Sequence, residues 1–482
     1  MNAKKNYIYN VTYNVLSVLT PLITAPYLSR VLNKDGLGLY SYYYAIAYYL
    51  TIFGRLGLLN YGTRYIAKKK KNESELKSAF SSIYCLQIIS SILAAIVYFI
   101  IVTVIVKKNV VVGLVFGVWV VGNIFNIDWL LFGLERFKDT ACRSIVVRFA
   151  ELIMIFVVVR DASDVWKYCL VMSLGYVCNF IIFWDFGKKY LSFSSVKPED
   201  VLQHVKPAII LLLPVIALNI YRQMDKVMLG SICDMSSTGL YEAAEKIIYS
   251  LTMFISSLGT VMMPRMSALI SSGDEEKVQK NVGDSLVFIT AMTSAFCFGV
   301  LAVSDIFIPL YYGVNFEGSI VLINLLAVTL ILIGWGNVVR TQYIIPTDRD
   351  NVYILSISIG AIVNVIVNFI LMPSLGAVGA CIGTICAELV VPVVQGIAIR
   401  KSFHEGKYII QAAPFVVFGF IMLVATKTVE YILGKSVSTM IVEICVGGVI
   451  YLLLSILYYR IFKKESYMYY KQKLNSMIKR KC

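Results

Sequence analysis

The chain has 482 residues, of which 58% are hydrophobic and 15% charged, and its formal net charge is +15. A soluble domain must cover its outside with polar side chains, so this composition excludes one and indicates a polytopic membrane protein. A basic balance can also reflect nucleic-acid binding, but in a membrane protein it is first explained by topology and by attraction to anionic lipid.

Fourteen apolar stretches are long enough to cross the roughly 30 Å of hydrocarbon as helices. We therefore predict an all-α integral membrane protein with 14 transmembrane helices, joined by loops too short to fold as domains. The predicted helices begin near residues 8, 39, 78, 110, 143, 165, 207, 240, 285, 318, 352, 376, 412 and 440, and the last ends near Phe462.

Lysine and arginine are concentrated on one side of these helices. If the N-terminus is cytoplasmic, the inner segments hold 30 of them and the outer loops only 7. The positive-inside rule therefore predicts that both termini are cytoplasmic. The basic tail, residues 463–482, is predicted to be disordered or to lie on the inner leaflet.

Residues typical of catalytic and metal sites are scarce. The ten cysteines fall mostly inside predicted helices, without metal-ligand spacing. We predict that His204 and His404 are solvated residues of inner loops. The segment Gly434-Lys435-Ser436 lacks the preceding glycine of a phosphate-binding loop, since that position is Val429. These patterns predict no catalytic residue, no metal and no cofactor.

An internal repeat is visible at an offset of 201 residues. Gly38-Leu39-Tyr40 opens the second predicted helix and Gly239-Leu240-Tyr241 opens the eighth. Phe53 likewise corresponds to Phe254, and Arg64 to Arg265. Six helices separate the copies, so the repeats are parallel, and we predict two six-helix lobes followed by two further helices. The predicted divisions are residues 1–200, 201–402, 403–462 and the tail 463–482.

Charged residues inside the predicted helices are the strongest functional candidates, because each is costly unless it faces protein or water. Arg222, Asp225 and Lys226 share one helix face through i, i+3 and i+4 spacing. They form either an internally neutralised salt bridge or a cavity wall with surplus positive charge, in which Asp225 exchanges a proton or a cation. Asp128, in the fourth predicted helix, is a second candidate for ion coupling.

Arg55 and Arg340 lie near the inner ends of their helices. They can extend to the interface, or face inward and bind a diphosphate bidentately. Lys246 would extend the positive surface outward. The predicted cationic cavity therefore comprises Arg55, Arg222, Lys226, Lys246 and Arg340.

Tyr40, Tyr44 and Tyr48 recur at intervals of four, so they form a stripe along the second predicted helix. Tyrosine combines an apolar ring with a hydroxyl, which suits both sugar faces and a wet cavity. An interfacial aromatic belt or simple packing is the alternative explanation.

Six segments in this order resemble the polysaccharide transporters of the multidrug/oligosaccharidyl-lipid/polysaccharide exporter superfamily. They are NVLSVLTPLITAPYLSRVLNKDGLGLYSY, LNYGTRYIAKK, TGLYEAAEKI followed by MMPRMSAL, QYIIPTDRDN, and LGAVGACIGTICAE. The resemblance covers the whole chain.

The resemblance implies two lobes around a cationic cavity that opens alternately to each side of a bacterial cytoplasmic membrane. It implies a substrate of oligosaccharide on undecaprenyl diphosphate, moved without ATP and coupled to an ion gradient or the membrane potential. A polysaccharide polymerase and a chain-length regulator are possible partners. Related lipid II flippases carry arginines deep in their first helix, and here none occurs before Arg30, which disfavours lipid II as the substrate. The alternatives are a cation-coupled multidrug exporter and a membrane polysaccharide polymerase.

Overall fold

The computed structural model describes residues 3–192, 196–403 and 406–462, without the side chains of residues 3–19, 137, 213–214, 217–218, 220–222 and 462. Within these ranges the chain is helical, with no strand. Ten helical segments have the length and hydropathy of a membrane span. Two arms of α1, together with α6 and α9, account for the other four predicted helices, so the 14-helix all-α fold is confirmed.

The chain forms two compact units. The first comprises the chain up to Ala243 together with Asn364–Gly383. Its helices are α1 (Ala3–Arg55), α2 (Leu58–Lys69), α3 (Glu73–Ile100) with a π-helical extension (Ile101–Val106), α4 (Val110–Gly122), α5 (Asp128–Gly133), α6 (Phe137–Val158), α7 (Val165–Ile181), α8 (Trp184–Lys188), α9 (Pro198–Ile232) and the first turns of α10 (Met235–Ser271).

The second unit comprises Ala244–Val363 and the chain from Thr384 onward. The lobes predicted from the sequence are defined by repetition rather than by packing, and they stay a prediction. The second unit contains the rest of α10, α11 (Glu275–Tyr312), α12 (Ser319–Ala327), α13 (Thr329–Val339) with a π-helical extension (Arg340–Ile344), most of α14 (Asp350–Leu375) and of α15 (Ala377–Ile399), α16 (Gly406–Leu433) and α17 (Val437–Phe462).

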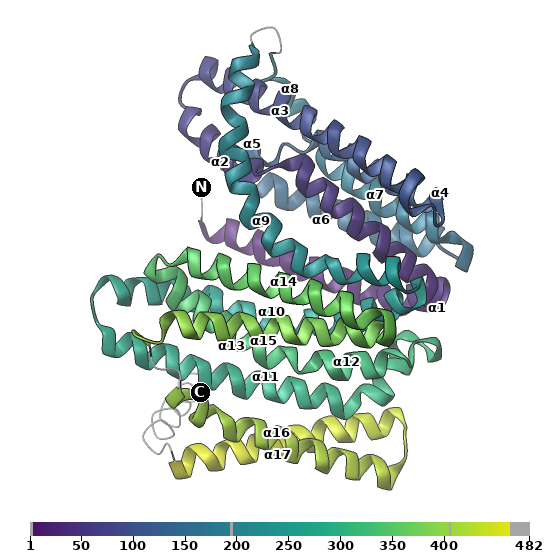
Figure 1. The fold of residues 1–482 in the computed structure, drawn as a ribbon, viewed down its shortest axis with the longest axis vertical. Coiled ribbons are helices and arrows are strands. Elements are labelled where there is room, and N and C mark those ends of the chain that lie inside the picture. The colour runs from purple at the N-terminus through teal and green to yellow at the C-terminus, as the bar shows by residue number, and fades with distance from the viewer. Residues whose placement is uncertain (1–2, 193–195, 404–405, 463–482) are drawn as a thin grey trace. The chain divides into compact units, whose positions relative to one another are not determined.

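Helix α1 contains the first two predicted spans. The backbone of Asn33 leaves helical geometry, with φ 57° and ψ −179°, and this kink divides the helix into two arms. Asparagine tolerates positive φ better than most residues. Helices α3, α4, α6, α7 and α9 all pack against α1, so α1 is the central element of the first unit (Figure 1).

The outward face of α3 shows why this fold needs lipid. Ile89, Leu93, Ile96 and Ile100 recur at helical spacing, and each has about half of its surface exposed. A soluble protein rarely leaves such a continuous apolar stripe in water. The stripe is the lipid-facing surface of a membrane helix.

Ion pairs neutralise charged residues within helix α6. Arg148 pairs with Glu151, three residues further along the helix, at 2.9 Å. The Arg143 side chain is 2% exposed and pairs with Asp128 at 2.8 Å. Helix α6 begins at Phe137, six residues before Arg143, so the pair connects α6 with the start of α5.

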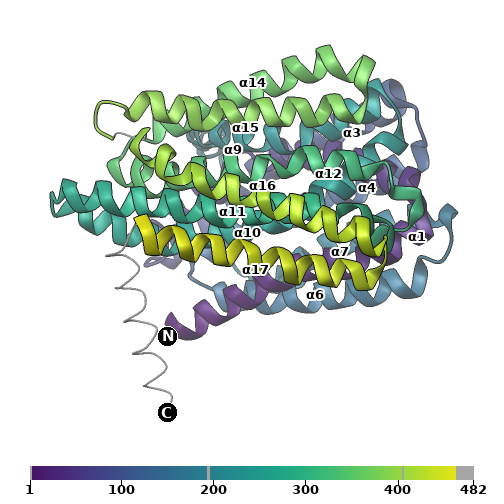
Figure 2. The same cartoon turned by 90° about the horizontal axis from the view of Figure 1, so that it is seen from below.

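In the second unit, α16 and α17 run side by side and pack on α11 (Figure 1, Figure 2). Lys427 of α16 forms ion pairs with Asp305 of α11 at 2.9 Å and with Glu430 at 2.6 Å. Lipid provides little drive for helices to associate, so packing and polar contacts of this kind hold them together.

The two repeat motifs contact each other directly in the first unit. A Cβ added to Gly38 would collide with the carbonyl oxygen of Met235, and one added to Gly239 would collide with the carbonyl oxygen of Lys34. Positions 34 and 235, like 38 and 239, differ by the same 201 residues. Such a reciprocal contact is what a two-fold axis between duplicated segments produces. Only glycine permits this close backbone approach.

Gly38→Ala is expected to lower the free energy of unfolding by about 1–3 kcal/mol, because backbone atoms cannot move aside for the new methyl group. Gly299→Ala is the matched control, since a Cβ there meets nothing within 4 Å. Gly299→Ala should leave the free energy of unfolding unchanged or raise it, because alanine favours a helix more than glycine does. Thermal unfolding of the detergent-solubilised protein measures both. Equal effects of the two substitutions would rule out a tight crossing at Gly38.

His204 requires a correction to the sequence analysis. It lies in the first turns of α9, before the span predicted from Pro207, and its side chain is buried rather than solvated. Its Nδ1 lies 2.6 Å from the hydroxyl of Tyr61 on α2, and its Nε2 lies 2.9 Å from the hydroxyl of Ser82 on α3. Burial lowers the pKa of His204 to about 4, from an ordinary value of 6.5. The neutral ring therefore joins three helices. His404 lies outside the described residues.

The stability of the protein should fall as the pH decreases from about 6.5 to 4. In this window the unfolded chain binds a proton at His204 and the folded chain does not, so each step towards acid favours unfolding. The full contribution is on the order of 3 kcal/mol and is complete below pH 4. Thermal unfolding across this range should show a shallower pH dependence for His204→Gln than for the unsubstituted protein. Parallel curves would contradict a neutral buried His204.

Candidate functional site

A cavity of about 250 Å³ lies inside the first unit, at the C-terminal end of α1. Helices α1, α4, α7 and α9 each contribute side chains to it, and two residues of the predicted site are among them. The lining residues are Tyr48, Thr51, Ile52, Arg55, Leu56, Gly57, Leu59, Asn60, Trp119, Tyr176, Val215 and Asn219.

Arg55 is the cation of this cavity. Its Nε donates to Asn123 Oδ1 at 2.9 Å, and its NH2 donates to the hydroxyl of Tyr176 at 2.6 Å. The guanidinium also lies 5.7 Å from the ring centroids of Tyr176 and Phe180. Among the described residues no carboxylate pairs with it. The positive charge is held in place by neutral groups and remains available to an anion.

Aromatic rings form one wall of the cavity. The rings of Trp119 and Tyr176 stack at a centroid distance of 3.9 Å. The Tyr48 hydroxyl donates to Asn219 Oδ1 at 2.8 Å. The indole Nε1 of Trp119 is buried and has no hydrogen-bond partner among the described residues. Flat rings with nearby polar groups match the apolar face and the hydroxyls of a sugar ring.

The tyrosine stripe predicted on α1 is present, and its three members have different surroundings. Tyr40 is buried against Phe116 and Tyr168. Tyr44 stacks between Tyr40 and Tyr48, with ring centroids 5.8 Å from each. Only Tyr48 lines the cavity. A sugar contact stays a prediction for all three.

A second polar cluster surrounds Asp225 in α9. Tyr241 donates to Asp225 Oδ2 at 2.6 Å, and Asn368 Nδ2 donates to Asp225 Oδ1. Asn368 Nδ2 also lies 3.2 Å from Asn364 Oδ1, and both asparagines are fully buried. A Cβ at Gly383 would collide with Asn368, so this glycine leaves the room that the asparagine occupies. The cluster provides one buried carboxylate with two neutral hydrogen-bond donors.

Lys226, predicted as part of the cationic cavity, pairs with Glu242 Oε2 at 2.6 Å. Both residues are largely buried, so the carboxylate compensates the charge where water cannot. The acid that neutralises Lys226 is thus on α10 rather than in its own cluster on α9, and a role of Lys226 in substrate binding stays a prediction. The side chain of Arg222 lies outside the description.

The remaining predicted cations belong to the second unit. Arg340 opens the π-helical turn after α13, and its NH1 donates to the hydroxyl of Tyr353 at 3.0 Å. Its guanidinium lies 5.1 Å from the ring centroid of Tyr353. Lys246 is a half-buried residue of α10. A single chamber shared by these cations and Arg55 stays a prediction.

Asp128, predicted for ion coupling, starts α5 and pairs with the buried Arg143. Two guanidinium nitrogens of Arg143 have no hydrogen-bond partner among the described residues. Removal of Asp128 would leave the buried charge of Arg143 uncompensated. Asp128 therefore stabilises the folded structure through this ion pair. Its role in coupling stays a prediction.

Sequence reasoning missed the neutral residues of both sites. Nothing in the order of residues distinguishes an inward-facing tryptophan or asparagine from one that faces lipid. A regular signal exists only for Asn364 and Asn368, which are four residues apart and therefore lie on one helix face. The missed residues are Trp119, Asn123, Tyr176, Asn219, Tyr241, Asn364 and Asn368. In the ranges that the structure describes, no group of three His, Cys, Asp or Glu residues could hold a metal ion.

Solved structures share this fold. A structure of the lipid II flippase MurJ in an inward closed conformation aligns with a TM-score of 0.70 and 15% identity, covering 95% of this chain and 99% of that one. An inward-facing transporter of the multidrug resistance MATE family aligns with a TM-score of 0.57 and 16% identity, covering 80% of this chain and 97% of that one. At these identities the likeness shows the fold alone.

Sequence comparison identifies the family. An O-antigen transporter of Escherichia coli (strain K12) is 22% identical over 412 residues, which are 83% of this chain and 98% of that protein. The profile of the family described as "Polysaccharide biosynthesis protein" matches residues 3–270, more than half of the chain. The multi-pass membrane fold and the transporter relative agree with that match, and the chain belongs to the polysaccharide biosynthesis protein family.

Proposed function

We propose that the protein is a flippase for undecaprenyl-diphosphate-linked oligosaccharide repeat units. It moves them from the inner to the outer leaflet of the bacterial cytoplasmic membrane by alternating access, with both termini cytoplasmic. The product supplies a surface polysaccharide such as capsule, O-antigen or exopolysaccharide. A polymerase and a chain-length regulator would act next on the translocated units.

The observation that carries this proposal is the arrangement of Arg55, whose guanidinium lies in the cavity and is held by neutral groups. In a membrane protein an arginine without an acidic partner is costly, so its retention in an aromatic-walled cavity requires a reason. An anionic substrate supplies one, because a guanidinium binds phosphate oxygens bidentately. Relatives with transporter names support the same reading.

The physical task requires no covalent chemistry. A diphosphate and several sugars cannot cross hydrocarbon unaided, since unpaired charge and unsatisfied hydroxyls each cost several kcal/mol. A polar path through the protein removes most of that barrier while the polyprenyl tail stays in lipid. Transporters with repeated lobes achieve this by rocking one lobe against the other.

A cation-coupled drug exporter is the second candidate, favoured only by the fold shared with the MATE structure. A cavity for organic cations should carry an unpaired acid rather than an unpaired arginine. A polysaccharide polymerase is a third candidate, and the short loops offer little room for its catalytic groups.

Arg55→Gln is expected to reduce translocation about 10- to 100-fold, the range for losing charge-assisted hydrogen bonds. Arg55→Lys should recover part of it, because an ammonium keeps the charge but not the planar fork. Arg30→Gln is the control, since it removes an exposed arginine from the same helix. Proteoliposomes containing the lipid-linked oligosaccharide, probed with a membrane-impermeant lectin, measure the rate.

A strain that lacks the gene provides the cellular test. It should lose its surface polysaccharide and accumulate the lipid-linked repeat unit in the inner leaflet. Normal surface display without this intermediate would refute the proposal. Exchange of organic cations by the purified protein would favour the exporter, and formation of glycosidic bonds would favour the polymerase.

We further propose that Asp225 couples transport to a cation or proton gradient. Asp225 is 3% exposed, and the amide of Asn368 and the hydroxyl of Tyr241 orient its carboxylate. Asp128, the other residue predicted for ion coupling, already compensates Arg143. The hydroxyl of Tyr241 and the amide of Asn368 next to Asp225 are neutral groups that can rearrange around a bound ion.

Asp225→Asn is expected to abolish stimulation of translocation by an imposed sodium or proton gradient while substrate binding persists, because asparagine keeps the shape but loses the charge. Asp185→Asn is the control, since the Asp185 side chain is 94% exposed. Initial rates in proteoliposomes with and without each gradient test the change. An undiminished gradient response in Asp225→Asn would exclude Asp225 as the coupling group.

A further inference from the structure

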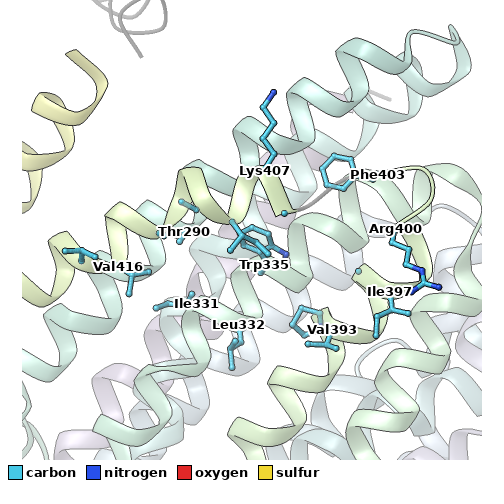
Figure 3. Close-up of a pocket in the computed structure, with 17 residues that line it drawn as sticks. Thr290, Ile331, Leu332, Trp335, Val393, Ile397, Arg400, Phe403, Lys407 and Val416 are labelled. Atoms are coloured by element: carbon cyan, nitrogen blue, oxygen red, sulfur yellow. The ribbon is translucent and has the colours of Figure 1, made fainter. Parts of the chain in front are cut away.

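A large apolar groove lies in the second unit, between α15 and α16, with α11 and α13 as its floor (Figure 3). Its volume of about 1050 Å³ is at the upper end of the range for ligand sites. Val393 and Ile397 on α15 and Ile409 and Val417 on α16 line it, and each is half exposed. We call it the α15–α16 groove. It is open along one side rather than enclosed.

Two cations flank one end of the α15–α16 groove. Arg400 follows the last residue of α15, and Lys407 lies in the first turn of α16, both near Phe403 (Figure 3). Both side chains are exposed, and neither forms an ion pair or hydrogen bond with another described residue. The predicted topology puts this end at the cytoplasmic face, where anionic lipid headgroups accumulate.

Residues around this end hold its geometry. The Tyr408 hydroxyl donates to the carbonyl oxygen of Gln279 at 3.1 Å. Phe403 is fully buried and stacks on Tyr408 at a centroid distance of 5.7 Å. Arg349 donates to the hydroxyl of Ser402 at 3.2 Å. The charged end of the groove is therefore a built feature rather than a chance opening beside a loop.

The length of the groove matches one leaflet. On α16 its lining residues extend from Lys407 to Val417, a rise of about 15 Å. Half of the roughly 30 Å hydrocarbon thickness is the same distance. An acyl chain that enters at the headgroup level would follow the groove to the bilayer midplane.

We propose that the α15–α16 groove binds an anionic phospholipid of the cytoplasmic leaflet. The phosphate lies between Arg400 and Lys407, and one acyl chain follows the apolar walls. A resident lipid fits the groove better than the transported substrate does. The diphosphate of the substrate must move from one leaflet to the other, whereas Arg400 and Lys407 both lie at one end of the groove and can bind a phosphate only there. The chain's own tail after Phe462 is rich in lysine and would be repelled by the same cations.

Native mass spectrometry of the purified full chain tests this site. After delipidation, the protein is mixed with phosphatidylglycerol or with zwitterionic phosphatidylcholine, and the retained lipid is counted. The unsubstituted protein should retain phosphatidylglycerol preferentially. Arg400→Gln and Lys407→Gln should each reduce that retention about tenfold, the effect of one lost charge-assisted contact.

Two further variants distinguish binding of the lipid headgroup from binding of the acyl chain. Lys401→Gln is the matched control, since this exposed lysine lies beside Arg400 but does not line the groove. It should leave phosphatidylglycerol retention unchanged. Ala413→Trp places a large ring in the groove from a solvent-accessible position, and it should reduce retention of both lipids.

Three outcomes would overturn the proposal. Equal retention of the two lipids, or an equal loss in Lys401→Gln, would mean that no specific phosphate site exists. Displacement of phosphatidylglycerol by undecaprenyl phosphate would assign the groove to the substrate. A dimer that Ala413→Trp converts to monomers would make the groove an interface between two copies. Because lipid retention is measured without transport, these results do not depend on the proposed flippase activity.

Discussion

The structure depends on one constraint, that a charge within hydrocarbon needs a partner of opposite charge or access to water. Most buried charges of the described helices satisfy it by pairing. Arg55 and Arg340 satisfy it differently, through tyrosine hydroxyls and ring faces that leave the positive charge uncompensated. That difference separates charges that hold helices together from charges that can meet a ligand. The paired residues are Asp128 with Arg143, Arg148 with Glu151, Lys226 with Glu242, and Lys427 with Asp305 and Glu430.

Small residues place these polar groups. Lipid is as apolar as leucine, so helices in a membrane associate through close packing and hydrogen bonds rather than through burial of apolar surface. Gly38 and Gly239 let two backbones touch, which sets the crossing of α1 and α10. Gly383 leaves space for Asn368, which in turn orients Asp225. The proposed coupling site thus depends on a residue that has no side chain.

Positive charge has two proposed uses in this protein, which differ in position. Arg55 lies in an aromatic cavity inside a helix bundle, where an anion would be drawn out of water. Arg400 and Lys407 lie at the exposed end of an apolar groove, where a lipid phosphate stays in its own leaflet. The first arrangement suits passage of a substrate, and the second suits a resident lipid. Composition alone counts both as basic residues and does not distinguish them.

The sequence by itself determined the helices of this protein, because the thickness of the bilayer dictates the length of each apolar stretch. It also determined the repeat, since Gly38 and Gly239 are equivalent in both sequence and contact. It predicted Arg55, Tyr48 and Asp225 as candidate residues, and the structure puts the first two in one cavity and gives the third a polar cluster.

Only the tertiary structure decided which partner each polar side chain has. His204 was expected in solvent and joins three helices, whereas Lys226 is neutralised by Glu242. Trp119 and Tyr176 have no sequence signal at all. Hydropathy reports how deep a residue can lie, but the rotation of a helix about its axis is set by neighbours that are distant in the sequence.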